Sequence, residues 1–266
     1  MIKALLITLL TATLAHAQGY DARMADYVRA WQIGAAGGAI DITTGLQHYW
    51  NPGGGGGTND LASGTRNAIL FGSVATTTNG WEFGTADGNY ITLGGAISNG
   101  TSYALAVWAQ PNKTAMDGHV SGGWLFCDRG PPAELTTRSD FQLTYSKSSE
   151  KFRFSTHDSV NNNNSVQSTS TVINTQWVHL MGVVDAADST VKMYVNGQLE
   201  ATTTLTITPN NRSDVPAMIG NSSWFVDASR QYHGTLDKIR FYNNFAPDAE
   251  FVEAVYQADG QAKGIL

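Results

Sequence analysis

Val191-Lys-Met-Tyr-Val-Asn-Gly-Gln-Leu-Glu-Ala-Thr-Thr-Thr204 is the stretch of this 266-residue chain that decides the fold class. Apolar and polar residues alternate in its first half, so Val191, Met193 and Val195 share one face of an expected strand. Asn196-Gly197 follows, a pair that readily takes the positive φ angles of a type I′ turn. The stretch therefore predicts a β-hairpin with one buried face.

The same pattern recurs along most of the chain. Short apolar runs are bounded by Gly, Asn, Pro and Ser, which favour turns. Because no helical periodicity separates these runs, the sequence predicts an all-β fold, an antiparallel two-sheet sandwich or jelly roll. The expected strands span residues 46–50, 68–71, 80–83, 90–93, 103–109, 124–127, 141–145, 151–155, 165–172, 177–184, 191–195, 198–204, 217–220 and 234–242.

The remaining segments predict short helices and loops. Met24, Tyr27, Val28 and Trp31 recur at helical spacing, which indicates an N-terminal helix over residues 21–33. This helix either packs on the outside of the domain or attaches it to a partner.

One further helix and two loops are expected later in the chain. A C-terminal helix is expected over residues 247–256, with Pro247 in its first turn. The five glycines 53–57 lack the Gly-Lys-Ser/Thr of a phosphate-binding loop and are expected to form a mobile loop. Residues 161–164 are expected to form a polar loop tip.

The first residues resemble a secretory signal peptide. Lys3 precedes a short apolar run over residues 4–14, and Ala-His-Ala at 15–17 matches a cleavage site of small residues. The run is shorter than the roughly 20 residues that cross a bilayer. We therefore expect export, to the periplasm or the extracellular space, and no membrane span.

The expected domain organisation follows from these segments. Residues 1–17 form the signal peptide, residues 18–44 the N-terminal helix and a glycine-rich linker, and residues 45–266 one β-sandwich domain. A length of this size suits a single large β domain.

Composition narrows the class of partner. The formal net charge is −6, so neither nucleic acid nor an anionic membrane surface would be attracted to the protein as a whole. Charged residues make up only 14% of the chain. Cys127 is the single cysteine, which excludes an internal disulfide and favours a buried, inert thiol.

Several segments, taken in their order, resemble the laminin-G-like branch of the concanavalin-A-like lectin/glucanase jelly rolls. The resemblance covers about residues 45–257 and rests on Gly45-Leu-Gln-His-Tyr-Trp, Asp60-Leu-Ala-Ser-Gly, Trp81-Glu-Phe-Gly-Thr-Ala-Asp-Gly-Asn-Tyr-Ile, residues 103–111 and residues 176–242. It implies two curved antiparallel sheets stacked face to face. It also implies a mostly extracellular family of modules that bind carbohydrate or protein.

The sequence offers no catalytic residues. Glycosidases on such a fold use two carboxylates close together on one strand, and the glutamates here lack partners at that spacing. Gln231-Tyr232-His233 matches the Gln-x-His strand of polysaccharide lyases only superficially, and no nucleophile elbow occurs. His179 is interpreted as a hydrogen-bonded core histidine. We therefore predict that the protein is not an enzyme.

Asp237 is the candidate metal ligand. Strand alternation places it on the side of Ile239 and Phe241, where a carboxylate needs a cation, a metal or several backbone N–H donors. The resemblance implies one structural calcium, because related jelly rolls commonly bind one at the equivalent position. Calcium favours oxygen ligands. The alternative is an aspartate that caps a turn through backbone amides.

A loop rich in aromatic residues is the candidate ligand site. Trp224 and Phe225 could stack on sugar rings while Asp227 bonds to hydroxyl groups, and Tyr232 follows shortly after. Trp224 could equally cover the end of the core. These four residues are the predicted ligand-binding set.

Three hypotheses about function remain. The favoured one is a secreted, non-catalytic module that recognises carbohydrate or a component of the cell surface or matrix. The second is a structural or decoration subunit of an extracellular or viral assembly, docked through residues 21–33. The third is an unrecognised polysaccharide-active enzyme.

Overall fold

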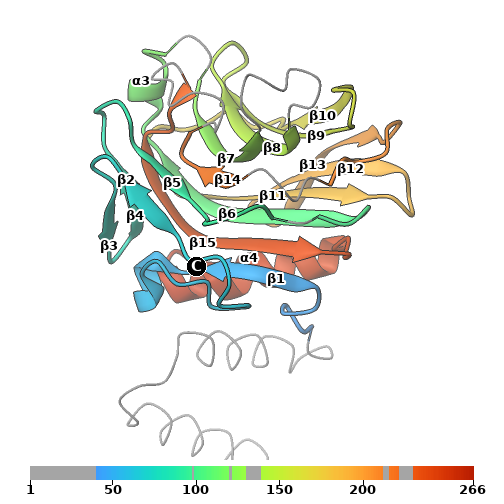
Figure 1. Cartoon of the computed structure of the whole chain (residues 1–266), viewed down its shortest axis with the longest axis horizontal. Helices are drawn as coiled ribbons and strands as arrows, with labels where there is room; N and C mark the ends of the chain where they lie inside the picture. Colours follow the sequence, from blue (N-terminus) through green and yellow to red (C-terminus); the bar gives the residue numbers. More distant parts are fainter. Residues whose placement is uncertain (1–39, 98, 120–121, 130–138, 212–215, 222–229) are drawn as a thin grey trace, which may run out of the picture.

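The computed structural model describes residues 40–97, 99–119, 122–129, 139–211, 216–221 and 230–266 (Figure 1). The expected signal peptide and the expected helix over residues 21–33 lie outside the described residues. None of the helices within these ranges combines the length and apolar character needed to cross a bilayer.

Within these ranges the chain forms two antiparallel sheets stacked as a sandwich (Figure 1). The eight-stranded sheet has the order β13-β12-β11-β6-β15-β4-β3, with β1 paired to β15. The seven-stranded sheet has the order β10-β9-β8-β7-β14-β5-β2. The prediction of an all-β jelly-roll sandwich is confirmed.

The strand bounds of the eight-stranded sheet are β1 Leu46–Trp50, β3 Ala75–Thr77, β4 Gly80–Phe83, β6 Tyr103–Pro111, β11 Val178–Asp185, β12 Thr190–Val195, β13 Gln198–Thr204 and β15 Gly234–Asn243. Those of the seven-stranded sheet are β2 Ile69–Phe71, β5 Tyr90–Thr92, β7 Trp124–Arg129, β8 Ser139–Ser146, β9 Lys151–His157, β10 Asn163–Gln167 and β14 Ala217–Ile219. The helical elements are η2 Pro52–Gly56, α3 Lys113–Met116 and α4 Ala249–Lys263.

The hairpin that decides the fold class forms as predicted. Asn196 and Gly197 have φ angles of 49° and 80°, the signs that a type I′ turn needs. Val191, Met193 and Val195 of β12 all enter the core between the sheets. That core buries large aromatic side chains, among them Trp50, Trp81, Tyr103, Phe141 and Phe154.

A second apolar layer lies on the outer face of the eight-stranded sheet, beneath α4 (Figure 1). Phe251, Val252 and Val255 of the helix are buried there against side chains of β6, β11, β12 and β15. Asp248 caps α4, because its carboxylate accepts a hydrogen bond from the Phe251 N–H at 2.9 Å. The helix thus begins after Pro247 and extends seven residues beyond the expected end at residue 256, to Lys263.

Other local expectations also need correction. The segment 161–164 is only partly a loop, because β10 begins at Asn163 and ends well before residue 172. The short edge strand β3 was not expected from the sequence. Glycines 53–56 belong to the turn η2, in which Asn51 accepts from the Gly54 N–H and Gly56 is buried, whereas Gly54 and Gly55 are exposed.

Candidate functional site

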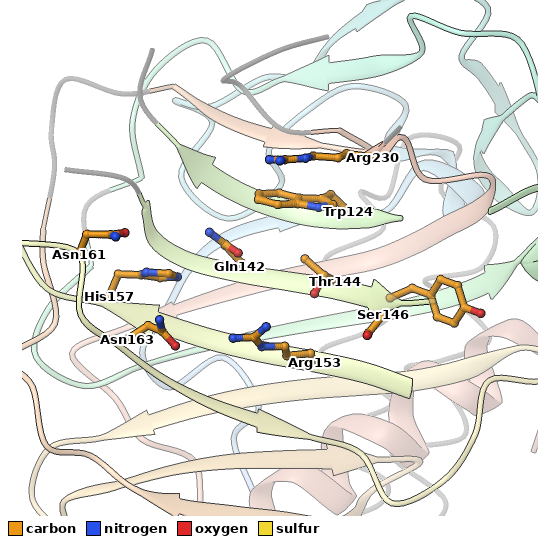
Figure 2. A pocket seen from close by; sticks show the side chains of 10 residues that line it. Trp124, Gln142, Thr144, Ser146, Arg153, His157, Asn161, Asn163 and Arg230 are labelled. Carbon is orange, nitrogen blue, oxygen red and sulfur yellow. The ribbon is translucent and has the colours of Figure 1, made fainter. Parts of the chain in front are cut away.

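A pocket of about 360 Å³ opens on the outer face of the seven-stranded sheet, over β7, β8, β9 and β10 (Figure 2). Its size falls within the range of about 300–1,000 Å³ that small-molecule sites occupy. The side chains of its described lining are mostly polar. They belong to Trp124, Gln142, Thr144, Tyr145, Ser146, Arg153, His157, Asn161, Asn163 and Arg230.

Strand alternation explains why polar groups gather here. In β8, Phe141 and Leu143 point into the core, so Gln142 and Thr144 point outward. In β9, Phe154 is in the core and Arg153 points outward between Phe152 and Phe154. Backbone hydrogen bonds between the strands hold these residues in place, and their side chains form the floor of the pocket.

The register of the strands sets which polar side chains are neighbours. Trp124 of β7 pairs with Thr144 of β8, and Thr144 pairs with Arg153 of β9, so the three lie in one row across the sheet. His157 at the end of β9 pairs with Asn163 of β10. Figure 2 shows these side chains around the same hollow.

The two arginines enter the pocket from different elements. Arg153 Nη2 donates to Ser165 Oγ at 3.1 Å. Arg230 precedes β15 and lies over the indole ring of Trp124, with its Cζ 5.3 Å from the ring centroid (Figure 2). Both guanidinium groups carry a permanent positive charge. Tyr145 takes no comparable part, because its hydroxyl donates to Asp117 Oδ1 at 2.6 Å.

The structure describes only one of the four predicted ligand-binding residues, Tyr232. Trp224, Phe225 and Asp227 lie outside the described residues. Tyr232 is fully buried in the core, where its ring meets Phe83 edge-on at 5.8 Å and its hydroxyl donates to the Thr235 carbonyl. In this conformation Tyr232 does not reach a surface ligand.

Asp237 lies on the opposite side of β15 from the one that alternation predicts. A bulge interrupts the pairing of β15 with β6 between Asp237 and Arg240, and Lys238 takes a φ of 50° there. Leu236 and Ile239 both face the core, whereas Asp237 accepts from Lys263 Nζ of α4 at 2.6 Å. The extra residue in the bulge is the physical reason for the change of side.

The surroundings of Asp237 do not fit a calcium ion. Its Oδ2 contacts the ammonium group of Lys263, and its Oδ1 accepts from the Gly53 N–H at 3.0 Å. Calcium sites combine several oxygen ligands, and the described residues hold no group of three or more His, Cys, Asp or Glu side chains that could bind a metal. A lysine and a backbone amide therefore compensate the buried carboxylate, which was one of the alternatives open from the sequence.

His179 is buried, as expected, but its hydrogen bonding differs from the expectation. Neither ring nitrogen has a hydrogen-bond partner in the described part of the chain. The ring lies against Trp108 and Tyr256 beneath α4. Burial, with a further contribution from the charge of Arg240, lowers the pKa of His179 to about 4, so the ring is neutral at physiological pH.

His48, Asp60 and Ser63 meet at the end of β1, but their geometry is not that of a catalytic triad. Asp60 Oδ2 lies 2.7 Å from His48 Nδ1, and the Ser63 hydroxyl donates to the same Oδ2 at 2.5 Å. A triad needs the serine on the opposite ring nitrogen from the aspartate. These contacts and the backbone N–H of Tyr49 lower the pKa of Asp60 against the opposing effect of burial, so the cluster holds β1 to the following loop.

Asp128 and Asp140 are buried side by side at the ends of β7 and β8. Asp128 Oδ1 accepts from the backbone N–H groups of Asp140 and Phe141, at 2.8 and 2.9 Å. Burial and the nearby charge of Asp140 raise the pKa of Asp128. Neither carboxylate belongs to the described lining of the pocket.

Sequence reasoning missed Gln142, Arg153, His157 and Asn163. The alternation in Phe141-Gln-Leu-Thr-Tyr and Phe152-Arg-Phe could have identified the outward side chains of β8 and β9. The sequence does not reveal which outer face a helix covers, so the pocket itself could not be located from it.

The comparisons with known proteins agree with this architecture. A laminin-G-like family model, described as the concanavalin A-like lectin/glucanases superfamily, matches residues 83–250. No curated protein matches the sequence.

Several solved structures are similar in fold. Domain 4 of AbnA, a GH43 extracellular arabinanase from Geobacillus stearothermophilus, in complex with arabinotriose, is 15% identical with a TM-score of 0.57, and the match covers 80% of this chain and 98% of that domain. The ligand binding domain of botulinum neurotoxin serotype D, in complex with N-acetylneuraminic acid, is 11% identical with a TM-score of 0.57, over 80% of this chain and 50% of the other. The heptameric SAP-like pentraxin of Limulus polyphemus is 13% identical with a TM-score of 0.52, over 82% and 84%. At these identities the likeness establishes the fold alone, and the chain spans about half of the toxin domain.

Proposed function

The chain belongs to the concanavalin A-like lectin/glucanase superfamily, and on that premise we propose that it is a non-catalytic protein that binds glycans in the outer pocket of the seven-stranded sheet. The observation that carries the proposal is the floor of that pocket. Gln142, Thr144, Arg153 and Asn163 present hydrogen-bonding groups from adjacent strands, and a saccharide is recognised through many such groups at fixed positions.

Two of the structural neighbours support a saccharide as the class of ligand. AbnA domain 4 was solved in complex with arabinotriose, and the toxin domain in complex with N-acetylneuraminic acid. Their likeness to this chain is one of fold, so it is the polar pocket, and not their ligands, that supports glycan binding here.

The absence of a carboxylate pair favours binding without turnover. Hydrolysis of a glycosidic bond normally needs two carboxyl groups that flank the bond. Among the described residues that line the pocket there is no Asp or Glu side chain. The buried Asp128 and Asp140 lie beneath the surface, with Asp128 engaged by two backbone amides.

A glycan array tests the proposal, with Gln142→Ala as the site variant and Gln261→Ala as its matched control. Gln261 is an exposed residue of α4, on the opposite sheet from the pocket. We expect the wild-type protein and the control to bind the same glycans. Gln142→Ala should weaken that binding by about twofold to tenfold, the value of one neutral hydrogen bond.

Two results would contradict the proposal. Failure of the wild-type protein to bind any glycan would remove the binding function. Release of reducing ends from a polysaccharide panel would replace the binding role with an enzymatic one.

We also propose that the protein works outside the cytoplasm. Lys3, the apolar run over residues 4–14 and the small residues before Gln18 support export. N-terminal sequencing of the protein recovered from the medium or periplasm should begin at Gln18. Cytoplasmic protein that retains Met1 would contradict this.

A further inference from the structure

Two permanent positive charges converge on the pocket of a protein whose formal net charge is −6. Arg153 rises from the floor on β9, and Arg230 lies on the far side above Trp124, with Gln142 and Thr144 between them (Figure 2). No acidic side chain lines the pocket among the described residues. We propose that the pocket selects glycans that carry carboxylate or sulfate groups, an inference that rests on the glycan-binding function proposed above.

Arg153 carries most of this argument. Its guanidinium group donates to the Ser165 hydroxyl, a neutral partner, and no carboxylate pairs with it in the described ranges. Two other partly buried cations have carboxylate partners: Lys113 contacts Asp117 at 2.6 Å, and Lys192 contacts Asp185 at 3.1 Å. A half-buried guanidinium without a carboxylate retains donors for an incoming anion.

Arg230 adds a second positive charge whose position is restricted by a neighbouring ring. Its guanidinium lies over the Trp124 ring, a cation–π contact that restricts where the group can go. Trp124 pairs with Thr144, and Thr144 pairs with Arg153, so Arg230 lies over one end of this row and Arg153 is at its other end. An anionic group bound by Arg153 would lie in the same pocket as this stacked pair.

The chemistry of the donors favours an anion over a neutral sugar. Guanidinium groups only donate hydrogen bonds, whereas sugar hydroxyls both donate and accept. A carboxylate or sulfate group only accepts, and its planar or tetrahedral oxygens suit the fork of an arginine. Asn163, which also lines the pocket, adds an amide that can both donate to and accept from the neighbouring hydroxyl groups of the same glycan.

Because the net charge of the protein is negative, the expected selectivity for anionic glycans depends on short-range contacts inside the pocket. A net negative protein does not attract anionic polymers at long range, so affinity must come from contacts inside the pocket. Such contacts are only partly screened by salt, because the groups are partly withdrawn from water.

Calorimetry with two matched pairs of probes tests the inference. The first pair is an oligogalacturonate and its methyl ester, and the second is dextran sulfate and dextran. We expect the charged member of at least one pair to bind about tenfold or more tightly than its neutral counterpart, since a hydrogen bond to a charged group contributes about 1.5–3 kcal/mol. Which pair responds distinguishes carboxylate from sulfate recognition.

Variants at two positions of β9 distinguish a direct contact with the ligand from the effect of the protein's net charge. Arg153→Gln should lose about tenfold or more of the affinity for the charged probe. Lys151→Gln removes the same charge two residues away, outside the described lining, and should bind within about twofold of wild type. Arg153→Lys keeps the positive charge but loses the planar, forked guanidinium group, so its affinity for the charged probe should lie between those of Arg153→Gln and Lys151→Gln. This variant tests the inference even where Arg153→Gln folds poorly.

Each contrary outcome has a distinct meaning. Equal binding of charged and neutral probes, or equal effects of Arg153→Gln and Lys151→Gln, overturns the anion selectivity. If neither pair binds, the selectivity is overturned as well. Binding of neutral glycans on the array then leaves the proposed function standing, whereas an array without any binding removes both.

Discussion

The outer faces of the two sheets use charged residues in opposite ways. Beneath α4, on the eight-stranded sheet, Arg240 Nη2 meets Asp259 Oδ1 at 2.7 Å and Lys263 meets Asp237 at 2.6 Å, with all four side chains almost entirely buried. On the seven-stranded sheet, Arg153 faces an open pocket and bonds to a serine hydroxyl. The first face is closed by pairing within the chain, and the second keeps its donors directed at solvent.

The charges on the two faces therefore have different roles, one in stability and the other in ligand binding. A buried charge costs several kcal/mol unless it is paired, so the charges under α4 are part of the fold. Arg153 remains in contact with water, so the fold does not require a carboxylate beside it. Substitutions on the two faces should therefore affect different measurements.

The largest effect on stability is expected from Asp259→Ala. Removal of the carboxylate leaves Arg240 buried without its partner, because the guanidinium also donates to Asp259 Oδ2 through Nε at 3.1 Å. We expect the free energy of unfolding to fall by about 3–5 kcal/mol in chemical denaturation. Glycan affinity per folded molecule should be unchanged.

The double variant Arg240→Met/Asp259→Leu is the control for this prediction. It removes both charges and keeps apolar volume, so most of the lost stability should return. A double variant as unstable as Asp259→Ala would mean that packing, and not the unpaired charge, accounts for the loss.

The second largest effect is expected on the pH dependence of the unfolding free energy, through His179. The folded-state pKa of about 4 lies below the ordinary value of 6.5, so this group supports the fold above pH 6.5 and loses that contribution as the pH falls toward 4. The difference amounts to about 3 kcal/mol. His179→Phe should make the unfolding free energy less dependent on pH across this window. Identical pH profiles for the two proteins would contradict a neutral buried imidazole.

A smaller effect, of opposite sign, is expected for Asp128→Asn. The raised pKa of Asp128 means that its contribution to stability is present below pH 3.8 and is lost as the pH rises through the folded-state pKa. Asparagine keeps an oxygen for the N–H groups of Asp140 and Phe141 without the charge. The variant should be more stable than the wild-type protein at neutral pH in chemical denaturation, because it has no buried carboxyl group to ionise. A loss of stability at pH 7 and no change at pH 4 would contradict this account.

The sequence predicted the sandwich well because its signals are local. The alternation in β12 and the Asn196-Gly197 turn specify a hairpin without reference to the rest of the chain. Asp237 was misplaced because one residue, Lys238, is bulged, and a single extra residue reverses the side on which its neighbours lie.

The site was harder to predict because it depends on contacts between distant segments. Arg153 and Arg230 are 77 residues apart in the chain, and only the order of strands in the sheet brings them to one pocket. The predicted set of Trp224, Phe225 and Asp227 followed a local cue of loop aromatics and lies outside the described residues. Tyr232 followed the same cue, although its side chain packs in the core.

Amide chemical shifts during titration with the tightest glycan of the array test the central claim most directly. If the ligand lies on the open face, the largest shifts should come from Gln142, Thr144, Arg153 and Asn163, and the amides of α4 should not move. Shifts concentrated in α4, with β8 and β9 unchanged, would contradict it.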